Sequence, residues 1–92
     1  MLHEIKIYKS YADAVIEGRK NFEVRFNDRG YNAGDQVKFK VYDGIYPDYN
    51  HPLDGCIYDI TYVQSGLGLE KEYVVFGIKV GSVPYKERED KE

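Results

Sequence analysis

The clearest signal in this sequence is a change of hydrophobic period along the chain. Between residues 8 and 16, apolar side chains recur at positions i, i+3, i+4, i+7 and i+8, which is typical of one face of an α-helix. The members of this face are Tyr8, Tyr11, Ala12, Val15 and Ile16. Ser10 is positioned to cap the helix, with Asp13 at capping-box spacing, and Gly18 is placed to end it. We therefore predict one main helix early in the chain.

Elsewhere, apolar and polar residues alternate with a period of two, which is typical of β-strands with one buried face. The alternating or β-rich segments are residues 3–7, 22–26, 37–41, 56–63 and 74–80. The predicted order is β-α-β-β-β-β, an α+β chain that is mainly β. Because consecutive strands with one apolar face each need a shared interior, a two-layer sheet and a small barrel both fit. We favour the barrel, since closure removes exposed strand edges.

The alternation in the second strand also predicts which side chains are buried. Successive side chains point to opposite faces of a strand. The apolar residues of residues 22–26 are Phe22, Val24 and Phe26, and we expect them to face the core. Glu23 and Arg25 then share the opposite face.

The length of 92 residues allows one small domain with a modest core. We expect that domain over residues 1–85 and a solvated, wholly charged tail over residues 86–92. No run approaches the roughly 18 apolar residues that a membrane span requires, so we expect no contact with membranes. The N-terminal residues also lack the basic and apolar regions of a secretion signal.

Cysteine and histidine are scarce. The single Cys56 cannot form an internal disulfide, which suits a reducing cytoplasm. Two histidines and one cysteine are too few and too scattered for a structural zinc site. We therefore expect a cytoplasmic protein with neither a metal nor a cofactor.

The charge distribution restricts the type of nucleic-acid binding that is expected. The formal net charge is −3 at pH 7, which argues against nonspecific duplex binding through a broad basic surface. Residues 1–40 carry +2, however, and residues 41–92 carry −5. This asymmetry leaves room for a small basic cleft that binds one phosphate or a few nucleotides.

Residues 17–29 are the most informative part of the chain. Lys20 follows the predicted helix, and Glu23 and Arg25 alternate on the next strand. One interpretation is a solvated strand face with ion pairs of about 0.2–1 kcal/mol each. The other is a cleft, in which a lysine offers a mobile point charge for a phosphate and an arginine offers a planar fork. Glu23 would then either bind the ligand or neutralise Arg25.

The run from Gly18 to Arg25 resembles the G-x-K-x-x-E-x-R signature of ASCH domains, which are relatives of the RNA-binding PUA fold. Most of the chain also resembles a compact subfamily of bacteria and phages, the domain of unknown function 3850. The resemblance implies a PUA-like barrel of five or six strands, with a helix beside its mouth and a cleft lined by the signature. The residues that it implies for ligand binding are Lys20, Glu23, Arg25, Asn27, Arg29 and His3. For His3, a hydrogen-bonded strand histidine remains the alternative.

The resemblance favours a noncatalytic module that binds RNA or a nucleotide-like ligand. The alternative is a small hydrolase that acts on a modified nucleoside or on RNA. In related amidohydrolases a threonine nucleophile follows the signature lysine by three positions, but that position is Glu23 here. Because the segment has no serine or threonine, the sequence disfavours this reaction.

A second alternative is an accessory protein that binds another protein through the tyrosine-rich loop at residues 43–54. This loop is long for a small domain, and long loops in compact domains are often functional. Tyr46 and Tyr49 would either stack on bases or anchor the loop. His51 lies in the same loop, where we expect it to be exposed.

Overall fold

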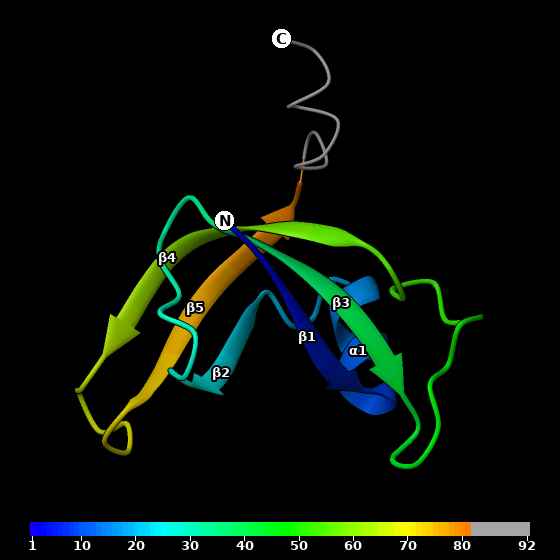
Figure 1. The fold of residues 1–92 in the computed structure, drawn as a ribbon, viewed down its shortest axis with the longest axis horizontal. Coiled ribbons are helices and arrows are strands. Elements are labelled where there is room, and N and C mark those ends of the chain that lie inside the picture. Colours follow the sequence, from blue (N-terminus) through cyan, green and yellow to red (C-terminus); the bar gives the residue numbers. More distant parts are fainter. Residues whose placement is uncertain (82–92) are drawn as a thin grey trace, which may run out of the picture.

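The computed structural model describes residues 1–81 as a mainly-β fold (Figure 1). The described elements are β1 (Leu2–Tyr8), α1 (Lys9–Ile16), β2 (Phe22–Phe26), β3 (Gln36–Tyr42), β4 (Ile57–Ser65) and β5 (Tyr73–Val80). The predicted order β-α-β-β-β-β is therefore confirmed. The predicted domain end at residue 85 and the charged tail at 86–92 lie outside the described residues.

The five strands form one sheet in the order β1-β3-β4-β5-β2. β1 pairs with β3 in parallel, and the other neighbours are antiparallel. A register shift between Ile60 and Tyr62 interrupts the β4–β5 ladder. The sheet curls into an arch whose two free edges, β1 and β2, do not pair with each other (Figure 1). The predicted barrel is thus a half-barrel, which leaves two strand edges facing a gap.

Two arginine side chains span this gap. The Nη2 atom of Arg25 donates to the carbonyl oxygen of Lys6 at 2.7 Å, and Nη1 of Arg29 donates to that of Glu4 at 2.6 Å. Carbonyl groups alternate in direction along a strand, so those of residues 4 and 6 point to the same side of β1. Backbone acceptors need partners. The guanidinium groups therefore provide donors for two backbone carbonyls of β1 that would pair with another strand in a closed barrel.

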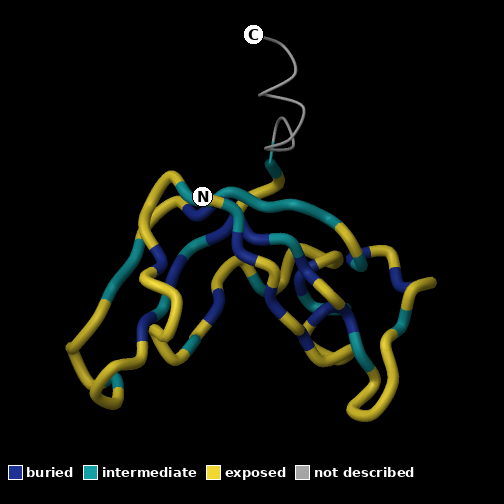
Figure 2. The backbone as a smooth tube through the Cα atoms, viewed as in Figure 1, coloured by how far each residue is buried: buried dark blue, intermediate teal, exposed yellow. Residues whose placement is uncertain are grey.

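The hydrophobic core is formed mainly by alternate residues of the strands, and Figure 2 shows where the buried residues lie along the backbone. Its members are Ile5, Ile7, Ala12, Val15, Tyr31, Val37, Phe39, Val41, Leu53, Ile60, Val74, Phe76 and Ile78. The alternation predicted the inward faces of β1, β3 and β5 correctly, except that Val80 at the end of β5 is exposed.

The faces of β2 are reversed from the prediction. Glu23 is 3% exposed, whereas Phe22, Val24 and Phe26 are 42–49% exposed. The register explains this reversal, because Glu23 lies opposite the buried Phe76 of β5. Residues that are directly opposite in an antiparallel pair share a face of the sheet. The strongly apolar inner face of β5 therefore directs the acidic residue of β2 inward.

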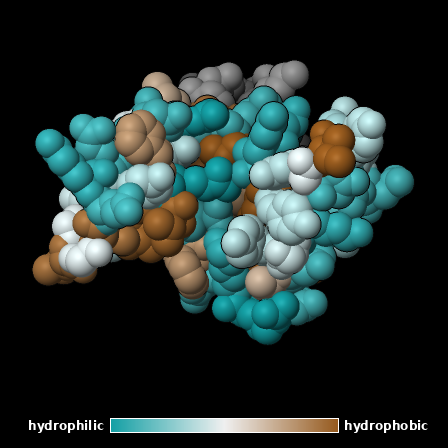
Figure 3. Space-filling view, turned by 90° about the horizontal axis from the view of Figure 1, so that it is seen from below, coloured by the Kyte–Doolittle hydropathy of each residue, from teal (hydrophilic) through white to brown (hydrophobic). Residues whose placement is uncertain are grey.

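Hydrophobic surface consequently gathers on the β2 side of the molecule. Figure 3 views the open side of the half-barrel and shows this surface toward the left, where β2 and the β4–β5 turn lie. Phe26 packs edge-on against Tyr73 of β5, with 5.7 Å between ring centroids. The exposed apolar face of β2 therefore continues onto the neighbouring strand.

The start of α1 also differs from the prediction. β1 leads directly into the helix, and the N-cap residue is the extended Tyr8, with no side-chain cap. Ser10 therefore lies within the helix and does not cap it. Gly18 has a φ of +79°, the left-handed conformation predicted after the helix end. No helix among the described residues has the length and apolar character that a membrane crossing requires.

The loop at residues 43–54 is tied to the rest of the molecule by its polar side chains. His51 is 9% exposed, so the prediction of an exposed histidine is wrong. Its Nδ1 atom accepts from the backbone N–H of Leu53 at 3.0 Å, and Nε2 lies 2.7 Å from Oδ1 of Asp13 in α1. Leu53 is fully buried. The histidine is therefore an anchor between the loop and the helix.

Candidate ligand-binding site

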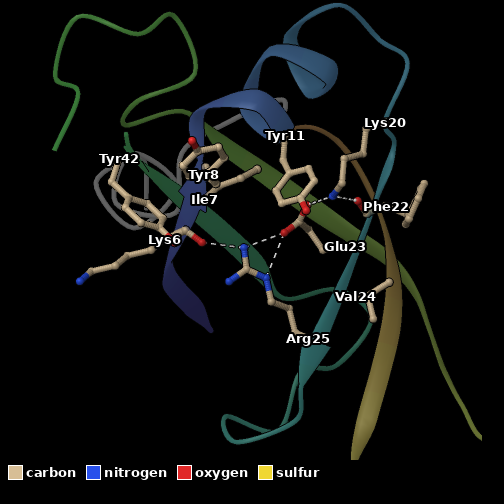
Figure 4. Close-up of a pocket in the computed structure, with 10 residues that line it drawn as sticks. All are labelled: Lys6, Ile7, Tyr8, Tyr11, Lys20, Phe22, Glu23, Val24, Arg25 and Tyr42. Carbon is tan, nitrogen blue, oxygen red and sulfur yellow. Dashed lines mark hydrogen bonds and ion pairs between the residues drawn. The ribbon is translucent and has the colours of Figure 1, made fainter. Parts of the chain in front are cut away.

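A pocket of about 510 Å³ opens in the gap between β1 and β2 (Figure 4). This volume falls within the range of roughly 300–1,000 Å³ that is typical of small-molecule sites. Its walls are the ends of β1 and β3, Tyr11 of α1, the connection to β2, and β2 itself. The lining residues are Lys6, Ile7, Tyr8, Tyr11, Lys20, Phe22, Glu23, Val24, Arg25 and Tyr42.

Glu23 is the centre of a small ionic cluster in this pocket. Its Oε1 atom accepts from Nε and Nη2 of Arg25 at 3.0 and 2.7 Å. Its Oε2 atom accepts from Nζ of Lys20, which also donates to the carbonyl oxygen of Phe22 at 2.7 Å. Two cations and one anion leave this cluster with a formal charge of +1.

The cluster is partly withdrawn from water. The exposed fractions of the side chains are 17% for Lys20, 4% for Glu23 and 24% for Arg25. A buried carboxylate is costly unless it is paired and hydrogen-bonded. Here both carboxylate oxygens of Glu23 accept hydrogen bonds from charged donors, and these offset the cost of burying the carboxylate. The three signature residues thus come together in one hollow.

Arg25 retains a donor for a ligand. Its Nε and Nη2 atoms make the contacts to Glu23 and Lys6, and no hydrogen bond within residues 1–81 uses Nη1. In Figure 4 this nitrogen points toward the side of the pocket where Lys6 lies. The guanidinium is therefore fixed in orientation by two partners while one end remains available to an anion.

Three tyrosines form an aromatic wall that the sequence analysis missed as part of the site. The ring of Tyr8 packs edge-on against those of Tyr11 and Tyr42, with centroid distances of 6.3 and 5.9 Å. Tyr8 is 42% exposed and Tyr11 is 57% exposed, so both rings are accessible in the lining of the pocket. The Nζ atom of Lys20 lies 5.8 Å from the centroid of the Tyr11 ring. The sequence did contain a signal for this wall, because Tyr8 and Tyr11 lie three residues apart and close to the basic residues Arg19 and Lys20.

The sequence comparisons place the chain in a family. Residues 2–78 match a family model described as a domain of unknown function (DUF3850). The chain belongs to this DUF3850 family. It is also 47% identical over 83 residues to an uncharacterized 12.9 kDa protein encoded in the GpA 3′ region of Escherichia phage P2. That alignment covers 89% of this chain and 72% of the phage protein.

The DUF3850 match includes all the residues that line the pocket, since these lie between Lys6 and Tyr42. The predicted relation to that small family is therefore confirmed. All of β1, β2 and β3, which carry most of the site, also fall within the matched range. The pocket thus lies within the residues that the family model matches.

The other three predicted site residues of this DUF3850 chain lie outside the lining of the pocket. Asn27 accepts the backbone N–H of Tyr31 through Oδ1 at 3.1 Å, which organises the turn after β2. Arg29 spans the gap to β1. His3 is 5% exposed and packs edge-on against the Tyr31 ring. Ligand contact by these three residues stays a prediction.

His3 has a specific acidic partner. Its Nε2 atom lies 2.9 Å from Oδ2 of Asp35, which also accepts the backbone N–H of Asn32. Burial raises the pKa of Asp35, but hydrogen bonds from His3, the N-terminal amine and the Asn32 N–H outweigh this effect. The pKa of Asp35 therefore lies below its usual value, and the pair connects the start of β1 to the turn before β3.

The chemistry of the pocket suits binding. Its lining offers cationic donors, aromatic rings and one carboxylate, but no serine, threonine, cysteine or histidine. Among the described residues, no three histidine, cysteine or acidic side chains are grouped so that they could hold a metal ion. Residues of these types can bind a planar group together with an anion.

Proposed function

We propose that this DUF3850 protein is a PUA-like module of the ASCH type that binds RNA or a nucleotide-like ligand between β1 and β2. One observation carries the proposal. Lys20, Glu23 and Arg25 meet in a partly buried cluster of net positive charge beside three tyrosine rings. The ligand is therefore expected to combine an anion with a flat aromatic group, as a nucleotide does.

The pocket suggests how such a ligand is held. The free end of the Arg25 guanidinium and the Lys20 ammonium bind the phosphate, because charge-assisted hydrogen bonds to anions are strong. Base stacking on an aromatic side chain contributes about 1–3 kcal/mol per base. The exposed Tyr11 ring offers such a surface next to Lys20. Glu23 orients both cations and lowers the charge they would otherwise place side by side.

The test compares binding by the wild-type protein and by pocket variants. Labelled random-sequence RNA and the four nucleoside monophosphates are titrated at low salt, because phosphate contacts weaken as salt rises. We expect the double substitution Lys20→Ala/Arg25→Ala to abolish binding. Lys79→Ala is the matched control, because Lys79 is exposed and lines neither pocket described here. Circular dichroism checks that each variant is folded.

A second variant separates loss of binding from loss of folding. The double substitution leaves the buried Glu23 without partners, whereas Tyr11→Ala removes a ring that is 57% exposed. We expect Tyr11→Ala to weaken binding about fivefold or more while the fold is retained. The proposal is wrong if wild type binds none of these ligands, or if Tyr11→Ala and Lys79→Ala bind equally well.

The same protein preparations distinguish the two alternatives. Turnover of a modified nucleoside or of RNA that Lys20→Ala removes would support a hydrolase. Cross-linking that recovers a protein partner and no nucleic acid would support an accessory protein. In that case the surface that binds the partner protein would be the loop at residues 43–54, where Ile45, Tyr46 and Tyr49 are 69–81% exposed.

A further inference from the structure

A second pocket adjoins the first one and extends the candidate site. We propose, as a step that rests on the function proposed above, that the ligand is single-stranded nucleic acid of at least two nucleotides. The second pocket has a volume of about 230 Å³ and lies between the β1–β3 pair and the loop at residues 43–54. Lys6 and Tyr42 line both pockets. A ligand that fills the first pocket therefore reaches the second across these two side chains.

The close-up shows how the shared side chains are placed. Lys6 and Tyr42 lie side by side at one end of the first pocket, and Lys20 and Phe22 lie at the other end (Figure 4). Arg25 is between them. Cations thus follow one another along the opening, with tyrosine rings between them. A single strand has the matching pattern, because phosphates and bases alternate along it.

The second pocket contains two lysines that face each other across strands. Lys6 of β1 is the register partner of Lys40 of β3, and like charges directly opposite destabilise a sheet. No ion pair within residues 1–81 involves either lysine. Asp54 also lines this pocket, and its Oδ1 atom accepts the backbone N–H of Val41. The net charge of the lining is still positive, so a second phosphate would relieve the repulsion between the lysines.

The loop presents an aromatic side chain from a backbone that is held by hydrogen bonds. Tyr49 lines the second pocket and is 77% exposed. The loop around it is held by the contact of His51 with Asp13 and by the turn at Asp43, whose Oδ1 accepts two backbone N–H groups. A preformed surface of this kind lowers the entropic cost of binding. Tyr49 is therefore positioned to stack on the second base.

The free edge of β1 is less suited to a peptide. A peptide that adds to a sheet edge pairs with the backbone groups of that edge. On β1, two carbonyl groups of the open edge already accept hydrogen bonds from Arg25 and Arg29. A duplex is also unsuitable, because its bases are stacked on each other and cannot reach the tyrosines. Single-stranded nucleic acid is the ligand class that uses both the cations and the rings.

The experiment measures affinity as a function of ligand length. The probes are nucleoside monophosphates and random-sequence oligoribonucleotides of roughly two to six nucleotides, the longest of which reach the lower end of single-strand site sizes, about 4–16 nucleotides. We expect the longer probes to bind about tenfold more tightly, or better, than the monophosphates. Lys40→Ala and Tyr49→Ala, whose side chains line the second pocket and not the first, should remove most of this gain. Lys40→Ala should also reduce the slope of log K against log salt by about 0.7.

The control is Lys38→Ala, because Lys38 lies on the same face of β3 as Lys40 but lines neither pocket. It should leave the length dependence intact. Monophosphate binding that requires Arg25, with no gain from longer probes, would overturn this inference while the proposed function stands. A gain that survives both second-pocket substitutions would also overturn it. Failure of wild type to bind any probe would overturn both proposals together.

Discussion

Glu23 determines the geometry of the candidate site, because each of its carboxylate oxygens is the acceptor for one of the two cations in the pocket. The sequence left two roles open for this residue, ligand contact and neutralisation of Arg25. In the structure the carboxylate is engaged by its neighbours, which supports the neutralising role. Its burial could not be predicted from the local pattern, because burial follows from the register with β5.

We predict that Glu23→Ala lowers the free energy of unfolding by about 3 kcal/mol, because it leaves two cations close together and partly buried. Urea denaturation measures this loss. Glu17→Ala is the control, since Glu17 pairs with Arg19 on the surface, where both side chains are more than half exposed. Such surface pairs contribute at most about 1 kcal/mol. Equal losses in the two variants would contradict the central role of Glu23.

Asp35 gives a prediction about pH. Its pKa in the folded state lies below the usual value for an aspartate, so its ionised form stabilises the fold at pH values above the unfolded-state pKa. This contribution is lost as the pH falls through the folded-state pKa. We expect Asp35→Asn to be less stable than wild type at about pH 6 and to lose less of its stability between about pH 5 and pH 3.

The measurement is urea denaturation of both proteins across this range of pH. The pKa of Asp43 is also low, because the backbone N–H groups of Tyr46 and Ile45 donate to its carboxylate. Wild type and Asp35→Asn share this second contribution, so it cancels in the comparison. Parallel stability curves for the two proteins would show that the contact between His3 and Asp35 has no such effect.

At the scale of the elements, the sequence predicted where strands form better than which way they face. β1, β3 and most of β5 have a single apolar face, and burial of that face is consistent with their pairing. β2 also has an apolar face, but its register with β5 places Glu23 opposite the buried Phe76 and turns the apolar residues outward. The partner strand therefore decides the orientation of β2. An alternating pattern predicts a strand, but it does not by itself decide which face of that strand is buried.

Two phenylalanines test this difference between strands. Phe39 of β3 is fully buried, whereas Phe22 of β2 is 42% exposed. We expect Phe39→Ala to lower the unfolding free energy by about 3–5 kcal/mol, the usual cost for a buried ring. Phe22→Ala should cost less than half as much, because its ring leaves no enclosed cavity. Denaturation by urea gives both values, and similar losses would mean that the β2 ring is packed in solution.

At the scale of the whole molecule, the site is where the barrel fails to close. The signature residues could be predicted as a group from the resemblance of residues 18–25 to a family signature, but the pocket depends on features that no local pattern contains. These are the strand order, which leaves β1 and β2 as free edges, and the arch that sets the edges opposite each other. Lys6, Tyr8 and Tyr42 enter the site only through this arrangement. Their roles were therefore beyond the reach of motif reasoning.

The arginines that span the gap differ in what they do for the molecule. Arg25 contacts both the Lys6 carbonyl and the acid in the pocket, whereas Arg29 contacts the Glu4 carbonyl and lies outside the pocket lining. We expect Arg29→Ala to cost about 1 kcal/mol of stability, since one hydrogen bond from a charged donor is lost. Hydrogen exchange at the amides of β1 should become faster, because the brace that connects the two edges is removed. Affinity for RNA should change far less than in Arg25→Ala.

Arg19→Ala is the matched control for this prediction, because Arg19 pairs with Glu17 on the surface and touches neither edge. It should alter neither exchange in β1 nor binding. If Arg29→Ala instead weakens RNA binding as strongly as Arg25→Ala and leaves exchange unchanged, Arg29 contacts the ligand, as its place beside the signature predicts. Hydrogen exchange and affinity together therefore distinguish the two roles of Arg29. If its hydrogen bond to the Glu4 carbonyl holds β1 in place, exchange in β1 changes; if Arg29 contacts the ligand, affinity changes.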